Sequence, residues 1–288
     1  MERNTVTAFV REVYGHWRRD NALSHGAALA YYTLFSMAPL LLLIIAIAGL
    51  VLGRAAAQGE LVGHIAGVIG PDGARTVESM IANVSAPRSG IIASAVSVLT
   101  ILFGASGVFG QLRTSLNQIW EVTVSEGGGV RGAARQRLAA FGIIVGIGGL
   151  LLASLALSAA LAAVHHLLAQ HLPVLGELLP PLNFLLSLFL TATLFAMIYK
   201  ILPDVQMDWR DVWLGAGATA VLFTIGKTLI GLYLSHTGAA SIYGAAGSLV
   251  LVLLWVYYCA QIFFVGAEFT EVYSRWYGSR RGENGSPE

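Results

Sequence analysis

The chain has 288 residues, of which 56% are hydrophobic and only 11% are charged, and its formal net charge is +1. A soluble domain carries charge on about a quarter of its residues, so this composition predicts a membrane protein. The nearly neutral chain offers no basic surface for nucleic acid, so that class of partner is not expected.

Long uncharged stretches separate the charged residues, and a membrane-spanning helix needs about 20 apolar residues. No Asp, Glu, Lys or Arg occurs between Asp20 and Arg54, which predicts a first span. Further uncharged stretches and proline turns predict five more, so we expect an all-α, six-span membrane domain over residues 25–277. The predicted spans cover residues 25–53, 89–112, 138–164, 182–202, 212–235 and 247–269.

Three segments lie outside these spans. In residues 1–24, apolar residues recur at helical spacing among arginines, which predicts a helix in the cytoplasmic membrane interface. Between the first two spans, apolar runs on either side of Pro71 predict two short amphipathic helices on the external face. The polar residues 278–288 are expected to form a disordered cytoplasmic tail.

The distribution of basic residues predicts the orientation, because Lys and Arg in short loops stay on the cytoplasmic side. Most of the 17 basic residues fall in the N-terminal segment, after spans two and four, and at the C-terminus. The opposite side holds only Arg54, Arg75 and Arg88. Both termini are therefore predicted to be cytoplasmic.

Four stretches, in order along the chain, carry a resemblance: AALAYYTLFSMAPLLLL (27–43), FGASGVFGQLRTSLNQIW (103–120), YKILPDVQMDWRDVWLGA (199–216) and SIYGAAGSLVLVLLWVYYCAQIFFVGAEF (241–269). They resemble the YihY/BrkB family of bacterial inner-membrane proteins. The resemblance implies six helices, cytoplasmic termini and a bacterial inner-membrane location. Residues 126–129 depart from the family pattern, in which an aromatic and basic segment follows Trp120, and predict a looser loop. The family has also carried the label of a tRNA-processing ribonuclease.

Catalysis is not expected. A nuclease needs Asp, Glu and His clustered around metal ions. The histidines that group are His165, His166 and His171, which could bind a metal but are more simply interfacial. The aspartates within residues 204–211 are interpreted as a solvated loop. With no phosphate-binding loop or nucleophile elbow, we expect no enzyme, no metal site and no cofactor, and we disfavour the ribonuclease label.

Lys227 is the one charged residue well inside a predicted span. Because a lysine at such depth costs at least ~2.5 kcal/mol, it should face the helix bundle or a wet cavity. It could receive an anionic substrate or headgroup there, or only snorkel to carbonyls and hydroxyls. Glu268 lies too far along the membrane normal for an ion pair with it. The other residues predicted to line a substrate path are Tyr32, Ser36, Pro39, Ser97, Tyr243 and Trp255.

Other polar residues receive structural roles. Pro39 is predicted to kink the first span, with the freed carbonyl either lining a cavity or satisfied by Ser36. Glu268 is expected to pair with Arg113 or Arg275 at the cytoplasmic interface. Arg113 and Asn117 follow a stripe of small residues that suits close helix packing.

The leading hypothesis is a transporter, channel or flippase-like protein for a small or lipidic solute, with an anionic solute favoured by Lys227. The alternative is a membrane protein that does not transport and acts in envelope assembly or as a scaffold for partners. The lipid bilayer and the solute are the expected partners, and a homo-oligomer remains an option.

Overall fold

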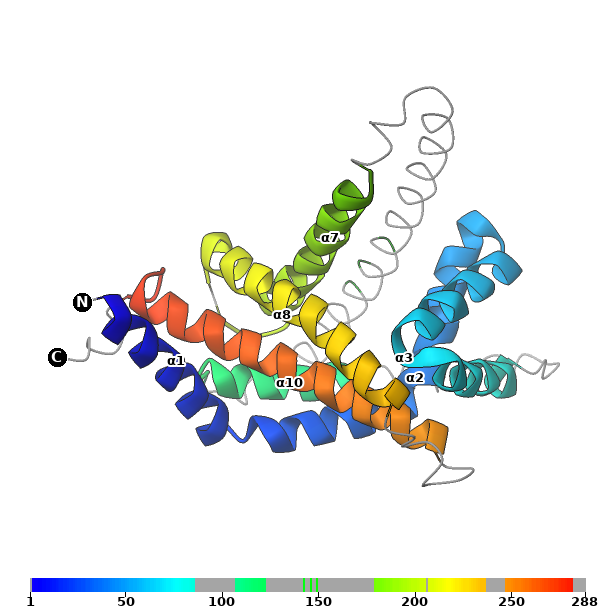
Figure 1. The fold of residues 1–288 in the computed structure, drawn as a ribbon, viewed down its shortest axis with the longest axis horizontal. Coiled ribbons are helices and arrows are strands. Elements are labelled where there is room, and N and C mark those ends of the chain that lie inside the picture. The colour runs from blue at the N-terminus through cyan, green and yellow to red at the C-terminus, as the bar shows by residue number, and fades with distance from the viewer. Residues whose placement is uncertain are drawn as a thin grey trace, which may run out of the picture.

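A computed structural model gives the fold of residues 2–85, 107–122, 142, 146, 149, 179–205, 207–236 and 247–281. These residues contain helices and no strands, which confirms the all-α prediction for the part described (Figure 1). A further helix covers residues 107–119. The labelled helices are α1 (Glu2–Arg19), α2 (Ala22–Leu52), α3 (Arg54–Ser85), α7 (Leu179–Ile201), α8 (Trp209–His236) and α10 (Gly247–Trp276).

Three helices in the described part are long and apolar enough to cross a membrane: Pro181–Ile201, Trp209–Tyr233 and Leu249–Trp276. They match the predicted spans 182–202, 212–235 and 247–269, although the last helix continues seven residues further, to Trp276. The helix α2 covers residues 25–52 of the predicted first span, 25–53. The predicted spans 89–112 and 138–164 fall largely outside the described residues, so the total of six remains a prediction.

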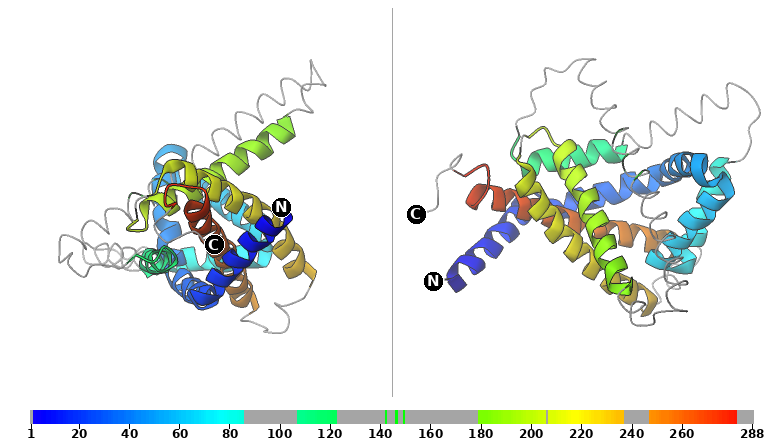
Figure 2. Two further views of the ribbon diagram at one scale, coloured as in Figure 1. Left: turned by 90° about the vertical axis from the view of Figure 1, so that its left-hand side faces the viewer. Right: turned by 90° about the horizontal axis from the view of Figure 1, so that it is seen from above.

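The outer faces of α7 and α8 suit a lipid environment. Large apolar side chains remain exposed along both helices, among them Phe184, Phe189, Ile225 and Leu229, each 54–58% exposed. Water would disfavour such a surface, whereas lipid tails solvate it. The helix α10, by contrast, lies inside the bundle and packs on α1, α2, α3 and α8 (Figure 2).

Two glycine–threonine pairs bring α8 and α10 into close contact. A Cβ atom added to Gly215 would lie 1.8 Å from Thr270 Oγ1, and one added to Gly266 would lie 1.9 Å from Thr219 Oγ1. Each threonine hydroxyl also donates a hydrogen bond to the carbonyl of the glycine on its own helix, at 2.7 Å for Thr219 and 2.6 Å for Thr270. Small residues at this spacing let two membrane helices approach closely.

The four stretches that carry the family resemblance meet in one apolar core. This core includes Leu29 of α2, Trp120, Tyr199 of α7 and Phe264 of α10, all buried. The Tyr199 hydroxyl donates a hydrogen bond of 2.8 Å to the Phe263 carbonyl, which satisfies its buried polar end. A second core joins α2, α3 and α10.

The helix α1 is present as predicted, but only part of its apolar surface is free to enter a membrane. Val6, Val10 and Tyr14 are 57–63% exposed, as an interfacial helix requires. Phe9 instead packs edge-on against Phe269 and Trp276 of α10. The helix is therefore docked on α10, which the interpretation as a surface anchor did not include.

The segment between the first two spans differs from its prediction. We expected two short amphipathic helices separated at Pro71, and the structure has one helix, α3, through all of Arg54–Ser85. A proline removes one helical hydrogen bond, here to the carbonyl of Gly67, and kinks a helix without necessarily ending it. The prediction therefore gave Pro71 too much weight as a helix terminator.

The segments predicted to be cytoplasmic come together at one end of the bundle, where α1 and the end of α10 lie side by side (Figure 1). Trp276 Nε1 donates to Glu12 Oε2 at 3.0 Å, joining the two ends of the chain. The chain is also fixed past the predicted tail boundary at residue 278, because Ser279 donates to Asp211 through its backbone N–H and its hydroxyl. Residues 282–288 lie outside the described part.

Candidate functional site: buried polar side chains between α1 and α10

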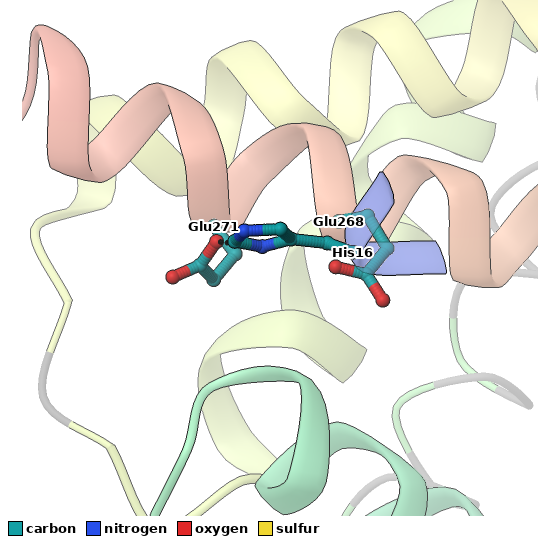
Figure 3. A group of neighbouring side chains, drawn as sticks. All are labelled: His16, Glu268 and Glu271. Carbon is teal, nitrogen blue, oxygen red and sulfur yellow. Dashed lines mark ion pairs between the residues drawn. The ribbon is translucent and has the colours of Figure 1, made fainter. Parts of the chain in front are cut away.

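The last turns of α10 place two carboxylates inside the protein. Glu268 is 0% exposed and Glu271 is 2% exposed. Their spacing of three residues puts both on the same face of the helix. His16 reaches this face from α1, as Figure 3 shows. We call His16, Glu268 and Glu271 the α1–α10 cluster.

The carboxylate of Glu271 is paired with Arg275 and lies beside His16. Its Oε1 lies 2.6 Å from Arg275 Nε, and its Oε2 accepts a hydrogen bond of 2.8 Å from the other end of the same guanidinium. One guanidinium nitrogen of Arg275 also lies 2.9 Å from His16 Nδ1 and 3.2 Å from His16 Nε2, and because a guanidinium only donates, the unprotonated ring nitrogen is the acceptor. Arg275 therefore bridges Glu271 and His16, whose facing atoms are 3.4 Å apart.

Glu268 is different, because neither of its carboxylate oxygens has a hydrogen-bond partner among the described residues. The predicted pairing of Glu268 with Arg113 or Arg275 is therefore wrong. Arg275 is used by Glu271, and Arg113 donates from Nε to Asp204 at 3.0 Å. The prediction failed because it matched charges by their depth in the membrane, whereas the direction of each side chain decides the pairing.

The candidate ligand atoms of the α1–α10 cluster all lie within 4.8 Å of one another. This group was not predicted from the sequence, because His16 is remote along the chain from the two glutamates. The two glutamates themselves could have indicated such a group. They are three residues apart at the end of an apolar helix, so they share a helix face and need a common partner. The histidines that were considered, His165, His166 and His171, lie outside the described residues.

Lys227 lies in α8 as predicted. Its side chain is half-buried, and it has no hydrogen bond or ion pair with any residue in the described ranges. The neighbouring Gly226 packs against Tyr258 and Ile262 of α10, so Lys227 stands beside the α8–α10 contact. Within the part of the chain that the structure describes, Lys227 forms no ion pair with Glu268.

The other predicted path residues are only partly placed. Ser36 is 1% exposed and donates to the carbonyl of Thr33 at 3.3 Å. Tyr32 is 42% exposed, and its ring lies against Gly107 of the neighbouring helix. Trp255 is half-buried beside the core of α2, α3 and α10. The helix α2 continues through Pro39, but the side chain of Pro39 and all of Ser97 and Tyr243 lie outside the described part.

Arg113 and Asn117 hold the end of their helix to the α7–α8 connection. Asn117 donates from Nδ2 to Asp204 Oδ2 at 3.0 Å and accepts from the Asp204 backbone N–H at 2.9 Å. Their predicted structural role thus has a defined partner. The interpretation of the nearby aspartates as a solvated loop is wrong for Asp211, which is 4% exposed and binds Ser279. Asp211 lies in the first turn of α8, and an aspartate there can accept from the backbone N–H of another segment, a use that was not considered.

The chemistry available to the α1–α10 cluster is that of an ion site. One imidazole and two carboxylates can share a cation or a proton. Buried ionisable groups in a membrane helix are costly and commonly serve ion pathways or substrate binding.

Comparison with known proteins agrees with the resemblance seen in the sequence. The family described as virulence factor BrkB matches residues 13–288. A UPF0761 membrane protein of Stenotrophomonas maltophilia is 28% identical over 279 residues, which cover 93% of this chain and 61% of the relative. A UPF0761 membrane protein of Pseudomonas aeruginosa is 28% identical over 273 residues, covering 92% of this chain and 62% of the relative.

A third relative, the UPF0761 membrane protein of Tolumonas auensis, is 29% identical over 190 residues, 64% of this chain and 58% of the relative. The chain thus spans about three fifths of the length of these relatives. No solved structure matches it. The family match covers nearly the whole chain and three of the described helices are long and apolar enough to span a bilayer, so the chain belongs to the BrkB family of membrane proteins.

Proposed function

We propose that this protein moves a small or lipidic solute across or within the bacterial inner membrane, as a transporter, channel or flippase-like protein without enzymatic activity. The bilayer and the solute are its partners, nucleic acid is not, and both termini face the cytoplasm. Homo-oligomer formation is compatible with this function.

Lys227 is the observation that carries the proposal. It lies in a helix that is long and apolar enough to cross the membrane, about 27 Å along α8 from Trp209 at 1.5 Å per residue. An ammonium at this position costs several kcal/mol unless water, a polar group or a ligand compensates it. Since no described residue pairs with Lys227, an anionic solute or headgroup is the compensation that the proposal assigns to it.

The orientation rests on the polar end of the bundle. Arg19 binds Glu121 at 2.8 Å and Arg113 binds Asp204 at 3.0 Å, so several segments rich in basic residues share one end. Because basic loops are retained in the cytoplasm, this end is assigned to the cytoplasmic side. The assignment leaves Lys227 in the outer half of the membrane.

Flux in proteoliposomes tests the function. The wild type is loaded with anionic solutes or fluorescent lipids and compared with Lys227→Met, which keeps the length of the side chain without the charge. We expect Lys227→Met to abolish flux and Lys227→Arg to retain it. Thr228→Met is the matched control, because it adds the same side chain at the adjacent exposed position and should leave flux unchanged.

The alternative role, in envelope assembly or as a scaffold, predicts a different outcome. A folded wild type would then show no flux of any solute tested. Lys227→Met would also leave the stability of the protein unchanged, since the lysine would only snorkel. Equal flux in the wild type and Lys227→Met would remove Lys227 from the path.

A further inference from the structure

We propose that His16, Glu268 and Glu271 bind one divalent transition-metal cation, of the class of Zn²⁺ or Mn²⁺, between α1 and α10. One imidazole nitrogen and two carboxylates are ligands that these cations accept. The proposal goes beyond the transport function and does not depend on it.

Glu268 provides the first argument. A carboxylate that is 0% exposed and has no hydrogen-bond partner for either oxygen is strongly unfavourable in a protein interior. A cation held between Glu268 and its neighbours would compensate both oxygens at once. Asp20, at the end of α1, also has a buried oxygen without a partner, so the surroundings are deficient in positive charge.

The arrangement of the three ligands provides the second argument. Glu268 and Glu271 share a face of α10, and His16 comes from a different helix, so the ligand atoms converge within 4.8 Å (Figure 3). Convergence from two helices is needed for a cation to contact all three ligands. The backbone is well placed to support it, since α1 is also fixed to α10 by Phe9 and by the bond from Trp276 to Glu12.

The charges around the cluster permit a cation. The carboxylates are Asp20, Glu121, Glu268 and Glu271, and the guanidiniums are Arg19 and Arg275, so the acids exceed the fixed bases by two. Arg275 contacts both carboxylate oxygens of Glu271 and so orients this side chain. Residues that hydrogen-bond to metal ligands commonly orient them in this way. His16 would ligate the cation through its unprotonated ring nitrogen, and the cation would then take the lone pair that the Arg275 guanidinium contacts in this structure.

A bound cation would also couple the two helices. It would add the free energy of metal binding to the docking of α1 on α10, because the unfolded chain does not hold these three ligands together. Metal binding should therefore raise the thermal stability of the protein as well as produce a binding signal.

The test uses the purified full chain in detergent, first freed of metal with a chelator. Isothermal titration calorimetry with Zn²⁺ and with Mn²⁺ gives the affinity and stoichiometry, and thermal unfolding with and without each metal gives the coupling. We expect one equivalent to bind and the melting temperature to rise. Glu268→Gln and His16→Gln should weaken binding by more than the ~10- to 100-fold that loss of an outer group costs.

Two comparisons keep the test decisive. Glu268→Gln has the same shape as the wild type and lacks the buried charge, so without metal it should be at least as stable as the wild type. Asp208→Asn removes an exposed carboxylate at the same end of the bundle and should bind metal as the wild type does. Absence of saturable binding to the wild type at millimolar metal overturns the proposal, as does unchanged affinity in both Glu268→Gln and His16→Gln.

Discussion

Substituting Gly266 by alanine tests the packing of α8 on α10. The new Cβ would lie 1.9 Å from Thr219 Oγ1 and 2.8 Å from the Cβ of Thr219, well inside van der Waals contact. Thr219 cannot simply rotate away, because its hydroxyl donates to the Gly215 carbonyl at 2.7 Å. The helices must separate or that hydrogen bond must break.

The magnitude follows from opposing effects. Overpacking a well-packed contact costs about 1–3 kcal/mol, and the lost hydrogen bond adds about 1 kcal/mol. Against this, alanine stabilises a helix by about 1 kcal/mol relative to glycine, because it has the higher helix propensity. We therefore expect Gly266→Ala to lower the free energy of unfolding by about 1–3 kcal/mol, measured by denaturation in mixed micelles with tryptophan fluorescence.

Gly217→Ala is the matched control. It makes the same change on α8, where no atom lies within 4 Å of the added Cβ. Only the helix preference should act there, so this variant should be as stable as the wild type or up to ~1 kcal/mol more stable. Equal stability of Gly266→Ala and Gly217→Ala would refute the close glycine–threonine contact.

Two other substitutions probe single hydrogen-bonded side chains. Tyr199→Phe removes the buried bond to the Phe263 carbonyl and should lower the free energy of unfolding by about 1 kcal/mol, whereas Tyr277→Phe, at an exposed position, should change little. Asn117→Ala breaks two bonds to Asp204, so proteolysis of the α7–α8 connection should become faster than in the wild type; unchanged proteolysis would show that these bonds do not hold the connection.

The helices were the predictable part of the fold. Membrane spans follow from uncharged length alone, which is why the predicted spans 182–202 and 212–235 agree closely with α7 and α8. The end of the last span was less predictable. Two glutamates, Glu268 and Glu271, indicate that the span ends at the membrane–water interface. Both are buried near α1 in the structure, and α10 continues to Trp276.

The polar contacts were much less predictable, because hydropathy carries no information on which faces of distant segments meet. Nothing in the sequence near His16 relates it to Glu271, and nothing near Asn117 relates it to Asp204. Arg113 illustrates the difficulty: its structural role was predicted, but its partner is Asp204 and not Glu268. The correct choice depends on side-chain direction, which only the assembled helices define.

The docking of α1 changes how the polar end of this protein must be understood. An amphipathic helix that only rests on a membrane needs apolar residues on one face and basic residues on the other. The helix α1 has these features at Val6 and Val10, yet it also places His16 beside two buried glutamates. Membrane contact does not require that placement, because a histidine in the interface could remain in water. Burial of Glu268 and Glu271 does require that placement of α1, since α1 contacts the face of α10 that carries them. The N-terminal helix therefore forms part of the α1–α10 cluster, in addition to contacting the bilayer.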